Sequence, residues 1–178
     1  MLLLVILIPM ILGGSVFFMP FNRIESNRRK TVLVLLGLNV LLSLMVLFQP
    51  EQYIQLLQLS NGLTFGLNAD TLAKFFLALV CFVWTMVGIY SLDYIKHEQH
   101  HERFYGFFFL SLAAMNGVCI SGNYMTLYLF FELLTLASMP LVLHTQTRDS
   151  IQAAKKYLYY SVFGASLGLL GFFFLAHF

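Results

Sequence analysis

Residues 124–144 read YMTLYLFFELLTLASMPLVLH, an apolar run with a single acid, Glu132. A helix rises about 1.5 Å per residue, so roughly 20 residues span the hydrocarbon core of a bilayer. This run therefore predicts a transmembrane helix.

The rest of the chain repeats this pattern. Its 178 residues are 60% hydrophobic and 10% charged, whereas soluble domains carry roughly 25% charged residues, so a soluble fold is excluded. Helices are predicted at residues 2–18, 31–48, 71–90, 104–121, 124–144 and 156–176. We expect one all-α transmembrane domain, a polytopic bundle of about six helices without a soluble domain. The first run has no basic start and no small-residue cleavage site, which favours a retained helix over a signal peptide.

The basic residues predict how the bundle lies in the membrane. The chain has 10 Lys and Arg residues, and all but Lys74 lie in or beside the first, third and fifth connections: Arg23, Arg28, Arg29, Lys30, Lys96, Arg103, Arg148, Lys155 and Lys156. By the positive-inside rule these connections face the cytoplasm, so both termini lie outside the cell membrane. The basic residues flank helices and form no single patch, so the expected surroundings are lipid and no nucleic-acid partner.

Glu132 is the candidate functional residue. It is roughly 12 Å and 18 Å from the two ends of its predicted helix, which places it near the middle of the membrane. An ionisable group there costs on the order of 3 kcal/mol, and such groups usually face a polar interior and serve transport. The alternative is a carboxylic acid that hydrogen-bonds a neighbouring helix. The chain supplies no cation at that depth, so we expect a further helix or chain to bring one.

Two other features of the last two helices are weaker candidates. Lys156 opens the sixth predicted helix, as a juxtamembrane charge or as a cation on a proton path. His144 closes the fifth on the same side, as a proton relay or a solvated helix-end residue. Gly164 and Gly168 have the small-xxx-small spacing that predicts close helix packing.

The longest connection runs from Gln49 to Asp70. Turn residues in it predict a small β-hairpin around Asn61-Gly62. Asp70 and Lys74 stand four residues apart, a spacing that predicts a structural ion pair at the outer end of the third helix.

One short motif suggests metal chemistry. His97, Glu98 and His101 match H-E-x-x-H, the zinc-protease signature. The loop is short and polar and offers no obvious third ligand, so chance placement is the better explanation. A membrane zinc protease is an alternative reading. Cys81 and Cys119 each fall inside a helix, so neither a disulfide nor a metal site is predicted.

Three segments together resemble a known family. They are residues 88–95 (GIYSLDYI), 127–142 (LYLFFELLTLASMPLV) and 153–157 (AAKKY). The chain resembles the antiporter-like subunits shared by respiratory complex I, membrane-bound hydrogenases, formate hydrogenlyases and Mrp sodium/proton antiporters. The resemblance runs from about residue 66 to residue 171, and the segment around Glu132 is its most specific part.

The resemblance implies a proton-translocating module of a larger complex. Glu132 would be the central proton-path residue, paired in the family with a lysine of a seventh helix, and Lys156 would take part in proton uptake. Other membrane subunits, including a chain or segment with the missing helices, would be its partners. This chain would bind no cofactor, while iron-sulfur, flavin or nickel-iron centres would belong to partner subunits of a complex I-like or hydrogenase complex. An Mrp-type antiporter subunit and a non-conducting scaffold are the alternatives.

Overall fold

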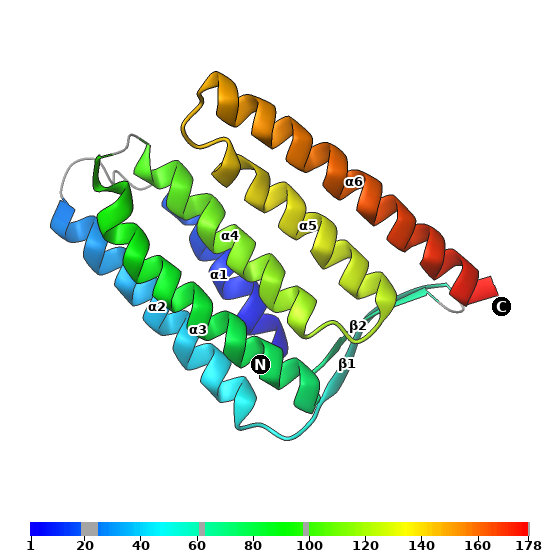
Figure 1. The fold of residues 1–178 in the computed structure, drawn as a ribbon. Coiled ribbons are helices and arrows are strands. Elements are labelled where there is room, and N and C mark those ends of the chain that lie inside the picture. Colours follow the sequence, from blue (N-terminus) through cyan, green and yellow to red (C-terminus); the bar gives the residue numbers. More distant parts are fainter. Residues whose placement is uncertain (19–24, 61–62, 98–99, 178) are drawn as a thin grey trace.

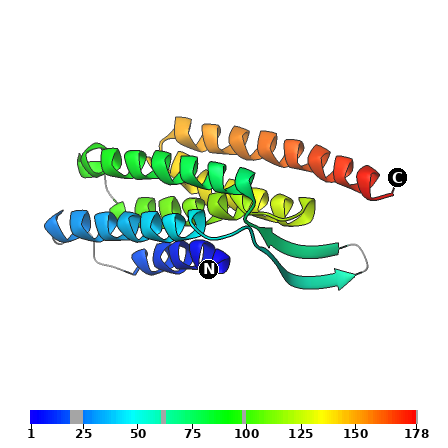
Figure 2. The same cartoon turned by 90° about the horizontal axis from the view of Figure 1, so that it is seen from below.

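A computed structural model describes residues 1–18, 25–60, 63–97 and 100–177 of the chain. These residues form six helices and one β-hairpin (Figure 1). The elements are α1 Leu2–Val16, α2 Glu25–Leu47, β1 Tyr53–Ser60, β2 Leu63–Asn68, α3 Thr71–Tyr94, the 3-10 turn η1 Ile95–His97, α4 His101–Cys119, α5 Tyr124–Val142 and α6 Arg148–His177. Consecutive helices run in opposite directions, and the hairpin leaves the bundle at the end where both termini lie (Figures 1 and 2). The predicted all-α fold class is confirmed.

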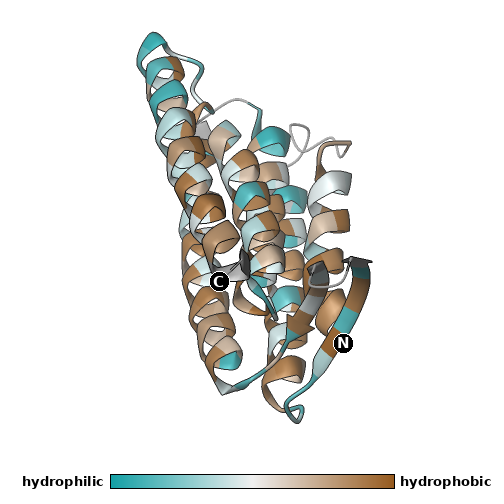
Figure 3. Ribbon diagram, turned by 90° about the vertical axis from the view of Figure 1, so that its right-hand side faces the viewer, coloured by the Kyte–Doolittle hydropathy of each residue, from teal (hydrophilic) through white to brown (hydrophobic). Residues whose placement is uncertain are grey.

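The helices have the length and composition of membrane spans. Among the described residues, four helical stretches are long and apolar enough to cross a membrane: Asn27–Leu47, Thr71–Tyr94, Tyr124–Val142 and Arg148–Phe174. α1 is apolar but shorter, and α4 buries polar Ser111 and Asn116 against its neighbours. Hydrophobic residues run along most of each helix, and hydrophilic ones occur at helix ends and also part-way along some helices (Figure 3). The chain is a multi-pass membrane protein.

The helices extend past the predicted apolar spans wherever charged residues adjoin them. α2 begins at Glu25 instead of residue 31, and α6 begins at Arg148 instead of residue 156. Hydropathy detects only the part of a helix that lies in the hydrocarbon core. Basic residues at the helix end extend their aliphatic chains so that the charged group reaches water, and the backbone there can remain helical. Lys156 therefore lies about two turns inside α6 and does not open it.

The core is built by α1 to α4. Both clusters of buried apolar side chains draw on these helices and on the segments that adjoin them. α1 approaches α4 closely at Gly13, where an added Cβ would lie 3.0 Å from the Leu110 nitrogen and 3.0 Å from the Phe109 Cβ. The close approach of α1 to α4 needs a glycine at position 13 because a backbone atom of α4 cannot move aside.

Cys81 and Cys119 are free thiols.

The predicted hairpin around Asn61-Gly62 is present, although those two residues lie outside the described ones. β1 and β2 pair antiparallel, with Tyr53 opposite Asn68. Backbone bonds join the hairpin to the connection between α4 and α5: Asn68 N donates to Ile120 O at 2.8 Å, and Gly122 N donates to Gly66 O at 2.8 Å. The hairpin thus holds the segment from which α5 starts.

Candidate functional site

Glu132 lies near the middle of α5. Its side chain is half-buried. Tyr128 lies one turn earlier on the same helix, close enough for its hydroxyl and the Glu132 carboxyl to act on one another. Within the described part of the chain, no basic side chain forms an ion pair with Glu132. The acid therefore has a local polar neighbour and no countercharge from the helices around it.

The start of α5 is fixed by the hairpin. The Asn123 side chain caps the helix by accepting from Thr126 N at 2.9 Å, and its amide donates to the Thr64 carbonyl at 2.7 Å. Gly66 N donates to the buried Thr126 hydroxyl at 3.0 Å. Asn, Ser and Thr caps satisfy the free N–H groups of a first helical turn. These bonds set the position of α5, and hence of Glu132, relative to the rest of the bundle.

A line of polar side chains follows Glu132 toward the end of α5. Thr135 is buried and its hydroxyl donates to the Phe131 carbonyl at 3.2 Å. The Ser138 hydroxyl donates to the Thr135 carbonyl at 3.2 Å and lies 2.7 Å from the Tyr157 hydroxyl of α6. Each step of three residues puts a group beside the one before it, but the two steps together place Ser138 roughly 120° around α5 from Glu132. The structure thus joins α5 to α6 through a polar contact about two turns beyond Glu132, on a different face of the helix.

Sequence reasoning passed over three of these groups. Tyr128, Ser138 and Tyr157 were not predicted as site residues. The signal that could have found Tyr128 is its helical spacing, four residues before Glu132. Ser138 is six residues after Glu132, roughly 120° around the helix, so spacing alone does not relate it to the acid. Tyr157 belongs to another helix, and only the packing of α6 against α5 brings it to Ser138.

The other predicted proton-path residues lie apart from Glu132. Lys156 is exposed on α6, and no described hydrogen bond or ion pair joins it to Glu132. His144 lies in the turn after α5, where its ring packs edge-on against Phe104 of α4 with centroids 5.5 Å apart. The end of α5, which His144 follows, and the start of α6, about two turns before Lys156, lie at the end of the bundle opposite the hairpin (Figure 1).

Asp70 and Lys74 have partners other than the predicted ones. Asp70 caps α3 by accepting from Ala73 N at 2.7 Å. The Lys74 ammonium donates to the Gln49 carbonyl. A helix N-cap carboxylate is occupied by backbone donors, and the flexible lysine stem reaches the carbonyl at the end of α2 instead. Asp70 thus stabilises the first turn of α3, and Lys74 connects α3 to the segment after α2 through the Gln49 carbonyl.

The predicted close packing at Gly164 and Gly168 is not found within the chain. An added Cβ at either residue would meet nothing within 4 Å. With Gly171 they line an apolar groove of about 570 Å³ between α5 and α6, whose other walls include Tyr124 and Phe131. Tight glycine contacts lie elsewhere, for example at Gly13 between α1 and α4, whereas α6 packs mainly against α5 in the described part of the chain.

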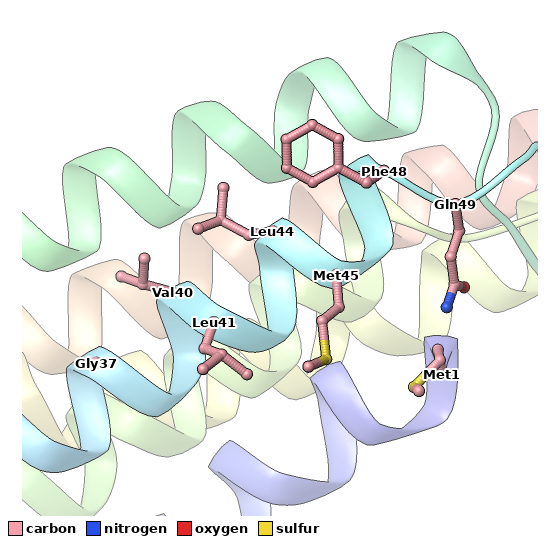
Figure 4. Close-up of a pocket in the computed structure, with 8 residues that line it drawn as sticks. All are labelled: Met1, Gly37, Val40, Leu41, Leu44, Met45, Phe48 and Gln49. Atoms are coloured by element: carbon pink, nitrogen blue, oxygen red, sulfur yellow. The ribbon is translucent and has the colours of Figure 1, made fainter.

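A second groove lies on α2, beside the start of α1. It has a volume of about 600 Å³ and is lined by Met1, Gly37, Val40, Leu41, Leu44, Met45, Phe48 and Gln49. Figure 4 shows its aliphatic and thioether side chains standing along one side of α2. None of these side chains is an acid or a base, so this groove suits lipid contact and not proton chemistry.

The H-E-x-x-H match does not form the helix that a zinc protease needs. His97 ends η1, and Glu98 lies outside the described residues. His100 has φ 61°, a left-handed conformation, and His101 starts α4 and is buried. The signature places its two histidines on one face of a continuous helix, which the left-handed residue interrupts. The described residues contain no cluster of three His, Cys, Asp or Glu groups able to hold a metal.

Two family models match the chain. The model of the N-terminus of NADH-ubiquinone oxidoreductase (complex I) chain 5 matches residues 57–105. The model of the NADH:quinone oxidoreductase/Mrp antiporter transmembrane region matches residues 121–178. The chain belongs to this antiporter-like family. Its first two helices and most of α4 lie outside both matches, whereas most of the hairpin and all of α3, α5 and α6 lie within them.

Individual relatives of the antiporter-like family agree. The Na(+)/H(+) antiporter subunit A1 of Staphylococcus aureus, from strain N315 and from strain Newman, is 37% identical over 111 residues, which is 62% of this chain and 14% of that protein. The fold is shared with the Mrp complex from Dietzia sp. DQ12-45-1b (TM-score 0.81, 22% identity, 95% of this chain, 18% of that one). It is also shared with an archaeal membrane-bound sulfane sulfur reductase (TM-score 0.74, 17% identity, 96% and 36%). The chain thus spans only a small part of the length of these relatives.

The candidate functional residues lie inside the segments that match the family, whereas much of the buried core lies outside them. Glu132, Lys156, His144 and the Ser138–Tyr157 contact all lie within the second matched segment, residues 121–178. The buried core between α1 and α4 lies largely outside both segments. The family resemblance is therefore concentrated where the intramembrane acid is, and it is weakest where the packing is tightest.

Proposed function

We propose that this chain is a membrane subunit of a multisubunit complex that moves protons or other cations, and that Glu132 is the group that carries the charge across its part of the membrane. The observation that carries the proposal is the half-buried carboxyl near the middle of α5, inside the segment that matches the antiporter-like family. Burying an ionisable group at that depth costs free energy, and such groups usually pair with another polar group or mark a transport pathway.

The proposal includes a partner for Glu132. No described basic side chain of this chain pairs with it, so the cation that balances the carboxylate comes from a further helix, on another chain or another segment. A positive charge near a carboxylate favours its ionised form, and moving that charge away favours uptake of a proton. A partner helix that approaches and withdraws would therefore make Glu132 load and release protons in turn.

The complex itself has two candidate identities. The first is an energy-converting oxidoreductase, complex I-like or a membrane-bound hydrogenase, with iron-sulfur, flavin or nickel-iron centres in partner subunits. The second is an Mrp-type sodium/proton antiporter without redox centres, which is favoured by the 37% identity to an Na(+)/H(+) antiporter subunit. Purification of the intact complex separates them. Nickel-iron or flavin subunits among the co-purifying chains support the oxidoreductase, and their absence from an active complex supports the antiporter.

The activity is tested in inverted membrane vesicles from cells with and without this chain. Proton movement is followed with a pH-sensitive dye, driven by an oxidisable substrate or by a sodium gradient. We expect proton movement to require this chain with the oxidisable substrate, with the sodium gradient, or with both. Unchanged proton movement in vesicles that lack the chain, under both drives, would leave only a scaffold role.

The proposed orientation puts the connections α1–α2, α3–α4 and α5–α6 in the cytoplasm and the hairpin outside. Gln58 of β1 and Thr145 of the α5–α6 connection are both exposed, and the hairpin and that connection lie at opposite ends of the bundle (Figure 1). A membrane-impermeant maleimide added to intact cells should label Gln58→Cys and spare Thr145→Cys, with the unmodified chain as control for Cys81 and Cys119. The reverse labelling pattern would contradict the orientation.

A further inference from the structure

Pro9 leaves a carbonyl of α1 without its helical donor. A proline has no backbone N–H, so the carbonyl four residues earlier loses its hydrogen bond. In α1 that carbonyl belongs to Val5, and both Val5 and Pro9 are buried. Such a group in the interior of a membrane bundle needs another donor, because no solvent reaches it.

Asn116 of α4 supplies that donor. Its Nδ2 donates to the Val5 carbonyl at 3.1 Å and to Oδ1 of Asn39 on α2 at 3.1 Å. The Val5 carbonyl can only accept, which fixes the Asn116 amide with its nitrogen toward α1. Asn116 is 0% exposed and Asn39 is 3% exposed. Three helices thus meet in one polar junction, with Asn116 at its centre.

The junction is incomplete as a set of hydrogen bonds. Two side-chain amides can pair reciprocally, but here the bond runs in one direction only, from Asn116 to Asn39. Asn116 Oδ1 is buried and has no hydrogen-bond partner among the described residues. A buried acceptor without a donor is unfavourable in a protein interior. Asn39, which accepts through Oδ1, keeps two donor hydrogens on Nδ2.

We propose that the junction of Val5, Asn39 and Asn116 is an intramembrane hydration site that holds one water molecule. The water donates to Asn116 Oδ1 and accepts from Asn39 Nδ2, which completes the second half of the amide pair. Buried waters are found where two or more otherwise unsatisfied polar groups face one small space. The site belongs to the α1, α2 and α4 part of the bundle and is independent of Glu132 and of the proposed transport.

The test is a cryo-electron microscopy map of the intact complex at a resolution that shows ordered water. We expect a density peak about 2.8 Å from Asn116 Oδ1 and at a similar distance from Asn39. In the same map, the absence of a peak here, with ordered water visible at other buried positions of equal local resolution, would overturn the proposal. So would a rotated Asn39 that donates directly to Asn116 Oδ1.

A variant map provides the matched control. Asn116→Leu keeps the size of the side chain and removes its polar atoms, so the peak should vanish while the rest of the bundle stays in place. If this variant fails to assemble, Asn39→Leu serves instead. It removes the amide that donates to the water, so the peak beside Asn116 should vanish or move. A peak that persists unmoved in either variant would contradict the assignment to Asn116.

Discussion

The two halves of this bundle differ in how much of their surface the chain itself covers. In α2, 33% of the spanning window is buried inside the protein, whereas in α6 the share is 6%. Among the described residues, both buried apolar clusters are built by α1 to α4 and the segments that adjoin them, and α5 adds only partly buried side chains. The half that carries the intramembrane acid is the half that depends on something outside the chain, either lipid or a partner subunit.

The largest expected effect comes from removing a matched aromatic ring from each half. Phe109 of α4 is 1% exposed, and Phe163 of α6 is 66% exposed. Phe109→Ala should destabilise the chain by about 3 kcal/mol, because its cavity cannot close. Phe163→Ala should change the stability very little. The measurement is equilibrium unfolding in detergent micelles, and similar losses for both variants would erase the distinction between the halves.

A glycine pair in α1 tests the close approach of α1 and α4. Gly13 lies against the α4 backbone, and its neighbour Gly14 has nothing within 4 Å of a Cβ position. Gly13→Ala should cost about 2 kcal/mol through overpacking, whereas Gly14→Ala should be neutral or slightly stabilising because alanine favours the helix. Unfolding of both variants under the same conditions checks this. Equal stabilities would mean that the helices separate without penalty.

The smallest expected effect concerns the polar link between α5 and α6. The Tyr157 hydroxyl lies 2.7 Å from the Ser138 hydroxyl, whereas Tyr160 on the same helix is 76% exposed. Tyr157→Phe should cost about 0.6 kcal/mol, the usual size of an interhelical hydrogen bond in membranes. Tyr160→Phe is the control and should cost nothing measurable. A larger loss for Tyr157→Phe would show that α6 relies on this contact more than its small buried surface indicates.

The sequence predicted the elements of the fold better than their contacts. Apolar runs and turn residues were sufficient for six helices and for the hairpin around residues 61–62, because helix length and hairpin turns are local properties. The start of α6 at Arg148 was missed because hydropathy cannot follow a helix into water. The bond from Lys74 to the Gln49 carbonyl was missed because it joins residues 25 apart. The Asp70 cap is a local bond to Ala73 N, and it was missed because the spacing to Lys74 was interpreted as an ion pair and the helix-capping signal was not considered.

The same distinction between local features and distant contacts applies to the candidate functional residues. Glu132 could be predicted from one acid in one apolar run, since depth follows from position in a helix. The junction at Asn116 could not, because nothing in the local sequence relates it to Val5 and Asn39, which lie 111 and 77 residues away. The open glycines of α6 were misjudged for a related reason, since spacing tells which residues share a face and not what covers that face.

The most direct test of the proposed function is transport by the intact complex with Glu132→Gln. Glutamine keeps the shape of the side chain and one acceptor oxygen, but it cannot take up a proton. At equal amounts of assembled complex, the initial rate of proton movement should fall by about tenfold or more. The same change at exposed Glu51, the matched control, should leave the rate unaltered. A Glu132→Gln complex that assembles fully and transports at the rate of the unmodified one would contradict the claim that this acid carries the charge.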